Sequence, residues 1–315
     1  MNRPLMPNLS VACLVALAAV AAITGVHAQA PQPKPEQNCG DIERDYELIR
    51  AEAVSIQTNL ALFGAADRGC DQLAKKLLDA GASLLARDRR GAMPLAHAAR
   101  GGHATLVEFF LAKSAPIDAR NVDGGTALFA AAEREKHSTV ALLLDKGADP
   151  NLTGRSELTA LMAAAFKGNG PIVETLLAHS ADPKLRDATG KAAMVYAASR
   201  GFDDIVRRLL DAGVDAQERY GNELTALMWA AGHDEGVGAG AVERVIDLLL
   251  AHGAALDGAD NRGRTALMIA AALGDAATVD VLLKRGADRG LKDKDGKTAR
   301  DLAANAEVRA RLEAK

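Results

Sequence analysis

The chain has 315 residues, and its 38 lysines and arginines nearly balance its 41 aspartates and glutamates. The net charge of −3 is small and the two signs are mixed along the sequence, so the basic stripe that nucleic acid requires is missing. We therefore expect no nucleic-acid partner. The length is ample for an extensive hydrophobic core.

Residues 1–28 have the features of a secretory signal peptide. Arg3 precedes the apolar run 11–26, and Val26 and Ala28 stand at the positions that signal peptidase reads. An uncleaved membrane anchor is the alternative, but the run is shorter than the roughly 20 apolar residues that a membrane-spanning helix needs. Lipidation at Cys13 is rejected because Ser10 occupies the place of the leucine in a lipoprotein signal. We expect cleavage after Ala28, no stable membrane insertion, and residence in the periplasm, with secretion as the alternative.

The segment after the expected cleavage site has two parts. Residues 29–38 are rich in proline and glutamine, a composition that predicts a flexible lead. Residues 39–58 predict an amphipathic helix that caps the N-terminal end of the fold. Its apolar residues at helical spacing are Ile42, Tyr46, Ile49, Ala53 and Ile56.

From residue 59 onward, one pattern recurs with a period of 33 residues. Each unit begins with threonine or a substitute for it, has two alanines five and six positions later, and continues into a second apolar stripe of helical spacing. Eight units in one phase predict stacked helix–turn–helix repeats. The units begin near residues 60, 93, 126, 159, 192, 225, 265 and 298, and only the interval after 225 is longer, by seven residues.

Glycines and aspartates mark the ends of the units. Glycine follows the second helix in most units, where a left-handed residue ends helices well, and Ser114 and Ser180 occupy the same slot and should end their helices less well. Aspartate three residues before a glycine, as in Asp88 and Gly91, predicts a tight turn into the next unit. The helix-ending glycines are Gly81, Gly147, Gly213, Gly253 and Gly286.

This pattern resembles the ankyrin repeat family, whose unit has the same length, a TPLHxAA helix start and a GAD-type turn. The nearest match to that start is MPLAHAA at residues 93–99. The resemblance implies an all-α solenoid of stacked helix–turn–helix units joined by β-turn or hairpin loops. Seven repeats would cover residues 59–297, with the seven-residue insertion in the sixth, and charged residues such as Arg300 indicate a capping half-repeat over 298–315. The family's histidine, which helps to tie turns together, is absent and is replaced by residues such as Ala96 and Phe129.

Two cysteines remain after signal cleavage, Cys39 and Cys70, in a compartment that permits disulfides. A bond between them would fasten the expected capping helix to the first repeat. The alternative is two unrelated thiols. Closing a loop of this length contributes roughly 3–4 kcal/mol in the chain-entropy model.

The resemblance implies that the protein binds a partner through its concave face, at the turn tips and the exposed ends of the first helices. Tyr196 and Trp229 occupy the same slot in adjacent units, where a ring either packs between helices or contacts a partner. The candidate contact residues are Arg89, Arg90, Arg100, Arg134, Arg155, Phe166, Lys167, Tyr196, Arg200, Tyr220, Trp229, His233, Arg262 and Arg264.

The sequence does not point to a catalytic site. His179 and His252 stand just before the residue that ends a helix, where a histidine interacts well with the helix C-terminus. The insertion, with His233, Asp234 and a glycine-rich stretch, lies between two helices rather than between a strand and a helix, so it lacks the context of a phosphate-binding loop. We expect a monomeric, non-enzymatic scaffold or regulator of another exported protein, without cofactor or metal. The alternatives are a secreted effector of a foreign protein and a small-ligand or enzymatic role at the insertion.

Overall fold

The structure, a computed structural model, describes residues 38–50 and 54–313. The expected signal peptide and residues 29–37 of the expected lead lie outside the described residues. In the described part of the chain the elements are helices, and no β-strand occurs, so the predicted all-α class is confirmed. In chain order the elements are α1 Cys39–Ile49, α2 Ser55–Arg68, α3 Asp71–Asp79, α4 Pro94–Gly101, α5 Ala104–Ala112, α6 Ala127–Glu133, α7 His137–Asp145, η1 Arg155–Glu157, α8 Ala160–Lys167, α9 Gly170–Ala178, α10 Ala193–Ser199, α11 Asp203–Asp211, η2 Gly221–Glu223, α12 Ala226–Ala231, α13 Ala239–Ala251, α14 Ala266–Leu273, α15 Ala276–Lys284, α16 Ala299–Leu302 and α17 Ala306–Glu313.

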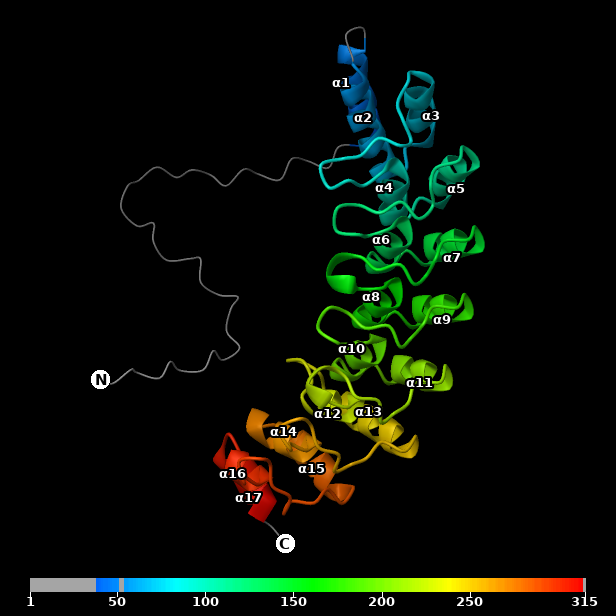
Figure 1. Cartoon of the computed structure of the whole chain (residues 1–315). Helices are drawn as coiled ribbons and strands as arrows, with labels where there is room; N and C mark the ends of the chain where they lie inside the picture. The colour runs from blue at the N-terminus through cyan, green and yellow to red at the C-terminus, as the bar shows by residue number, and fades with distance from the viewer. Residues whose placement is uncertain (1–37, 51–53, 314–315) are drawn as a thin grey trace, which may run out of the picture. The chain divides into compact units, whose positions relative to one another are not determined.

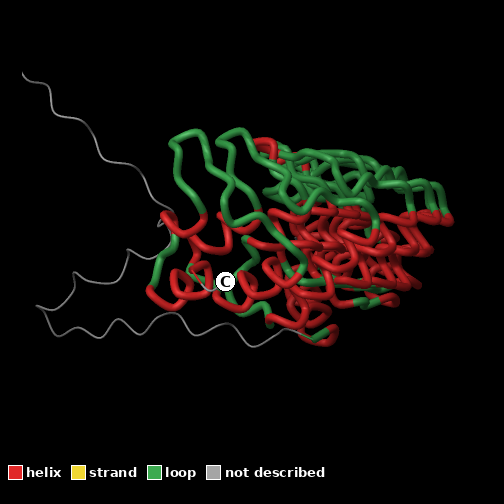
Figure 2. The backbone as a smooth tube through the Cα atoms, turned by 90° about the horizontal axis from the view of Figure 1, so that it is seen from below, coloured by secondary structure: helices red, strands yellow, loops and turns green. Residues whose placement is uncertain are grey.

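The helices of the repeats stack in two rows. Each first helix contacts the first helix of the next repeat. In order, these first helices are α2, α4, α6, α8, α10, α12, α14 and α16. The second helices from α5 to α17 contact one another in the same manner (Figure 1). The loops lie together on one side of these rows (Figure 2). We call this side, with the exposed ends of the first helices, the turn-side face.

Each first helix from α6 onward begins directly after the residue that marks the repeat. The hydroxyl oxygen of Thr126 accepts a hydrogen bond from the amide of Phe129 at 3.2 Å, and Thr159 accepts one from Met162 at 3.2 Å. A threonine here satisfies an amide that has no partner inside the helix, so it fixes where the helix starts. The same bond is made by Thr225, Thr265 and Thr298.

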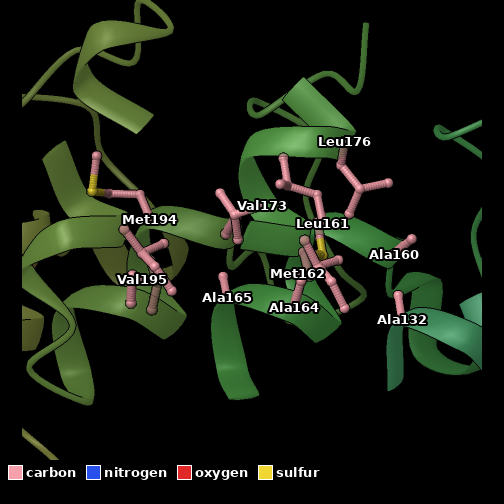
Figure 3. Packing of buried hydrophobic residues seen from close by; sticks show 14 of the residues in the cluster. Ala132, Ala160, Leu161, Met162, Ala164, Ala165, Val173, Leu176, Met194 and Val195 are labelled. Atoms are coloured by element: carbon pink, nitrogen blue, oxygen red, sulfur yellow. The ribbon is translucent and has the colours of Figure 1, made fainter. Parts of the chain in front are cut away.

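The alanine pairs and the apolar stripes of the second helices form the core. Ala164 and Ala165 of α8 are fully buried, as are Val173 and Leu176 of α9 (Figure 3). Alanine lets neighbouring first helices approach closely, whereas the larger side chains fill the space between the two rows. The core therefore runs along the stack, and stability accumulates between neighbouring units.

Side-chain oxygens of aspartate or asparagine hold most of the turns that lead into the first helices. One carboxylate oxygen of Asp88 accepts hydrogen bonds from the amides of Arg90 and Ala92, each at 2.8 Å. Gly91 in the same turn has a φ of 74°, a conformation that residues with a Cβ rarely adopt. The turns therefore have their own internal hydrogen bonds in a chain that lacks the histidine expected from the resemblance. The same pair of bonds is made by Asn121, Asp187, Asp260 and Asp293.

The second residue after each second helix from α3 to α15 is left-handed, as the sequence predicts. Gly147 has a φ of 89°, and a Cβ placed on it would meet no neighbouring atom within 4 Å. Ser114 and Ser180 hold the same conformation with a φ of 64°. Since a side chain disfavours this region, the two serines carry backbone strain that the glycines do not.

The N-terminal end differs from the single capping helix expected over 39–58. Instead, α1 ends at Ile49 and α2 begins at Ser55, so Leu60 lies inside α2 and not before it. Among the described residues no repeat turn precedes this unit to set the start of the helix at position 60, and α2 begins five residues earlier, at Ser55. Asn38, expected in the flexible lead, caps α1 by accepting a hydrogen bond from the amide of Asp41 at 3.0 Å.

Helix α1 covers the first repeat and is bonded to it. Ile42 and Tyr46 are buried, and α1 packs on α2. Cys39 at the start of α1 and Cys70 at the start of α3 form a disulfide with a Cα–Cα distance of 5.6 Å. The predicted bond is therefore present in this structure, and it fastens the N-terminal helix to the first unit.

At the C-terminal end, α16 and α17 form a short pair of helices where half a repeat was expected. Arg300, which replaces an apolar residue of the earlier units, is exposed. Its Nε lies 2.7 Å from Oε1 of Glu313, so the charged residues join the two helices of this last unit. The pattern of charge marks a departure from the repeat, but it does not remove the second helix.

Candidate partner-binding face

Four of the predicted contact residues line one hollow on the turn-side face, across units 2 to 4. The hollow has a volume of about 180 Å³, and we call it the arginine hollow. Three acidic residues, Asp88, Asp123 and Glu133, also line it. Its arginines are Arg90, Arg100, Arg134 and Arg155.

The arginines of this hollow differ in their pairing. Arg100 is neutralised, because its Nη2 lies 2.6 Å from Oδ1 of Asp67. Arg90, Arg134 and Arg155 are exposed and make no ion pair with any residue that the structure describes. The unpaired cations therefore project from the turns and the end of α6, where a partner could reach them.

His97 forms a buried part of the arginine hollow. Its Nδ1 lies 3.0 Å from Oδ2 of Asp67, and its Nε2 lies 3.1 Å from Oδ2 of Asp88. Burial opposes ionisation of Asp67, but the hydrogen bonds and electrostatic attraction of His97 and Arg100 outweigh it and hold the pKa of that carboxyl below its usual range. The cluster joins α2 to α4 and to the turn before α4, so it gives the hollow a fixed floor.

A second hollow, which we call the apolar hollow, adjoins the first across units 3 to 5. Its volume is about 360 Å³, and it shares Phe129 and Glu133 with the arginine hollow. Three predicted contact residues, Phe166, Lys167 and Tyr196, line it. The rest of its lining is Leu158, Met162 and Ala163. The two hollows therefore lie next to each other, and we call them together the groove, which has a basic part and an apolar part.

Phe166 is held at the edge of the apolar hollow. Its side chain is 42% exposed, and the guanidinium of Arg200 lies 4.4 Å from the centre of its ring. The ring of Tyr196 meets it edge to face with centres 5.9 Å apart. Such contacts contribute roughly 0.5–1.5 kcal/mol each, so Phe166 is positioned before any partner arrives.

Tyr196 and Trp229 both combine core packing with partial exposure. The hydroxyl of Tyr196 donates a hydrogen bond to Oδ2 of Asp187, and burial and that carboxylate raise the pKa of Tyr196. The ring of Trp229 packs against the core on one side, and Nζ of Lys191 lies 4.8 Å from its centre. Packing between helices and contact with a partner, the two interpretations left open by the sequence, are therefore compatible at these positions.

Tyr220 does not lie at the surface, contrary to the expectation that it contacts a partner. It occupies the turn position that holds aspartate in other units, and only 3% of it is exposed. The guanidinium of Arg186 lies 5.2 Å from the centre of its ring. A large ring in this turn folds inward because it has apolar surface to bury and no carboxylate with which to bind the turn amides.

The remaining predicted arginines do not join the groove. Arg262 and Arg264 line a separate hollow of about 430 Å³ between the last two turns, and Arg264 is bound to Asp260 at 2.8 Å. Arg89 is exposed at its turn and lines neither part of the groove. Arg200 also binds Asp234 at 3.3 Å, so its charge is partly neutralised.

A known protein-family model matches the repeats of this chain. The family model described as ankyrin repeats (3 copies) matches residues 62–154, 137–220, 161–239, 215–293 and 239–309, which together cover more than half of the chain. The chain belongs to the ankyrin repeat family. Ankyrin repeats are generally protein–protein interaction modules and are typically not enzymes. No curated protein matches the sequence closely enough to name a relative.

The insertion of the sixth ankyrin repeat is divided between a loop and a helix. Residues 232–238 separate α12 from α13, and α13 has 13 residues where α11 has 9. His233 binds Asp275 of the next repeat through Nε2 at 2.9 Å and the carbonyl of Asp234 through Nδ1 at 3.0 Å. Both nitrogens of His233 are therefore engaged within the protein, which favours a structural role over a catalytic one.

The other histidines that the sequence singled out lie as expected. Nδ1 of His179 lies 2.9 Å from the carbonyl oxygen of Thr175, and that of His252 lies 2.8 Å from the carbonyl oxygen of Leu248. Each ring thus binds the last turn of its own helix. Across residues 38–50 and 54–313, no group of three or more potential metal-binding side chains is found, and no helix is long and apolar enough to cross a membrane.

Several residues of the groove were not among the predicted contacts. Phe129, Leu158 and Met162 line the apolar hollow, and Asp67 and Asp88 fix His97 beneath the arginines. Phe129 and Met162 both replace the family's histidine, and these substitutions were the signal that could have drawn attention to this part of the surface. Leu158 gave no such signal.

Proposed function

We propose that this ankyrin repeat protein is exported to a bacterial periplasm, where it acts as a monomeric scaffold or regulator by binding another exported protein. The binding site in this proposal is the groove on the turn-side face of repeats 2 to 5. The observation that carries it is that the arginine and apolar hollows adjoin and share Phe129 and Glu133, because protein interfaces combine an apolar anchor with a polar rim.

Export is supported by two independent features. The N-terminal 28 residues have the pattern of a signal peptide. The disulfide between Cys39 and Cys70 suits an oxidising compartment, since cytosolic thiols are normally kept reduced. Cell fractionation tests this part of the proposal: recovery of the processed chain in the periplasm supports it, recovery in the cytoplasm contradicts it, and release into the medium would favour a secreted effector.

The groove is suited to binding because its residues are already positioned. Asp88 and Asn121 hold two of its turns, and Arg200 and Tyr196 hold Phe166, so less conformational freedom remains to be lost when a partner binds. Binding would then depend on the match of shape and charge. No reacting group is required, and in this proposal the protein performs no catalytic step.

Crosslinking in intact cells, followed by mass spectrometry of the captured protein, tests the binding site. We expect one defined protein to be captured by the wild type and lost when Arg134 and Arg155 are both replaced by glutamate. Arg207→Glu is the matched control, since Arg207 is an exposed arginine of α11 without an ion-pair partner among the described residues. Capture by the Arg134 and Arg155 double variant at the level of Arg207→Glu would contradict the proposed site.

A further inference from the structure

The groove has a charge that differs from the charge of the whole protein. Arg90, Arg134 and Arg155 around the arginine hollow and Lys167 beside the apolar hollow make no ion pair with a described residue. The chain as a whole carries a net charge of −3. A concentration of unpaired cations at one groove of an acidic protein attracts a partner of opposite charge.

Acidic residues in the groove limit what kind of anion fits. Asp123 and Glu133 are exposed and line the arginine hollow, and Glu133 also lines the apolar hollow. A uniformly charged polyanion would place negative charge against Glu133. A segment that alternates charged and apolar side chains avoids this contact, because an apolar side chain can lie where the two hollows meet.

The apolar hollow provides the place for such a side chain. Phe129, Leu158 and Met162 contribute its apolar lining, and Phe166 stands at its edge with the guanidinium of Arg200 4.4 Å from its ring centre. The aromatic face of Phe166 that Arg200 covers is not free to stack on a nucleic-acid base, which is the contact that single strands use. Together with the carboxylate of Glu133 where the two hollows meet, this arrangement favours a peptide over a nucleic acid.

From this charge and shape we infer that the partner presents an extended acidic segment with a large apolar side chain. The apolar side chain occupies the apolar hollow, and carboxylates of the same segment bind Arg134, Arg155 and Arg90 along the arginine hollow. The inference rests on the proposed function and deepens it by giving the chemical class of the partner segment.

Fluorescence anisotropy with the purified processed chain tests this inference. The probe is a fluorescein-labelled peptide of alternating leucine and glutamate, compared with peptides in which serine replaces leucine or lysine replaces glutamate. We expect the leucine–glutamate peptide to bind at least about tenfold more tightly than either comparison peptide, with an affinity that falls as salt is raised. Equal binding of the three peptides, or no binding of the first, would overturn the inference.

Variants locate the bound peptide. Replacing both Arg134 and Arg155 by glutamate should weaken its binding by about tenfold or more, whereas Arg207→Glu should change it by less than about twofold. Phe166→Ala should weaken binding of the leucine–glutamate peptide but not the residual binding of the serine–glutamate peptide. Unchanged helicity and melting temperature establish that each variant is folded. Loss of binding in Arg207→Glu equal to that in the double variant would overturn the site.

Two further outcomes separate this inference from the proposed function. Tighter binding of a fluorescein-labelled single-stranded oligothymidylate than of the leucine–glutamate peptide would overturn the acidic-peptide class and favour nucleic acid. If the peptide does not bind but the cellular crosslink still depends on Arg134 and Arg155, the inference fails while the proposed function stands. If the peptide binds at the groove and no cellular crosslink forms, the proposed function fails instead.

Discussion

Atom Nδ1 of His97 lies 3.0 Å from Oδ2 of Asp67, and this contact joins the first helices of repeats 1 and 2. The same carboxylate binds Arg100, so one acidic side chain of α2 holds both the buried floor and one rim arginine of the groove. Exposed charge pairs contribute little to stability, but this one is partly buried and forms a network.

The network predicts an acid-dependent stability. The folded pKa of Asp67 is lowered from its ordinary value of 3.8, so its contribution is present above about pH 4 and is lost as the pH falls through the lowered value. Asp67→Asn should lower the free energy of unfolding at neutral pH by about 1–3 kcal/mol and should flatten the decline in acid. Thermal unfolding followed across pH measures both effects. Asp123→Asn, an exposed neighbour in the same groove, should change neither, and an equally steep acid decline in Asp67→Asn would contradict the account.

The two left-handed serines predict gains in stability. Ser114→Gly and Ser180→Gly should each raise the free energy of unfolding by about 0.5–1 kcal/mol. Glycine adopts a positive φ without strain, and this gain exceeds the backbone freedom that glycine loses on folding. The reverse change Gly147→Ser is the matched control and should lower stability by a similar amount. Chemical denaturation measures all three variants. Stabilisation of the chain by Gly147→Ser would show that backbone strain does not govern this slot.

The disulfide predicts that the N-terminal end depends on oxidation. The bonded residues are separated by 31 positions, and removing such a link lowers stability by roughly 3–4 kcal/mol in the chain-entropy model. We expect Cys39→Ser, or reduction of the wild type, to increase amide hydrogen exchange in α1 to α3 while α13 to α15 stay protected, since repeats communicate mainly with their neighbours. A uniform increase along the whole stack would be inconsistent with this local role. Mass spectrometry of the unreduced protein provides the check on the bond itself.

Arg200 predicts a loss of binding without a loss of fold. Its guanidinium covers Phe166 and binds Asp234, so Arg200→Ala frees the ring at the edge of the apolar hollow. We expect partner capture to weaken by about tenfold because Phe166 is no longer held in place, while circular dichroism stays unchanged. Arg207→Ala, on the second helix α11, should leave capture intact. Capture that survives Arg200→Ala at full strength would remove this part of the groove from the site.

The sequence predicts the repeats well because the signals for them are local. Thr126 and Thr159 start their helices by binding an amide three residues away, and the glycines after the second helices supply a local backbone conformation. The position of Leu60 was misjudged for a related reason. Its slot follows the periodic pattern, but the described residues before it include no repeat turn that would set the start of the helix there.

The groove is less predictable because it depends on side chains of several repeats. Phe129 and Tyr196 are two repeats apart in sequence, yet both line the apolar hollow. Tyr220 shows the opposite case, in which a residue at an expected tip position turns inward, since the sequence pattern gives a position on the turn but not a side-chain direction. The basic residues were predictable as exposed, whereas their pairing with Asp67 or Asp234 required the stacked arrangement.

Photocrosslinking at single positions in intact cells tests the central claim most directly. A photoreactive residue replaces Arg134 or Phe166 in the groove, or Arg207 on the outer helices, and the crosslinked partner is identified by mass spectrometry. We expect the same protein to be crosslinked from positions 134 and 166 and not from position 207. Crosslinks to that protein from position 207 alone, with none from the groove, would contradict the proposal that this ankyrin repeat protein binds its partner on the turn-side face.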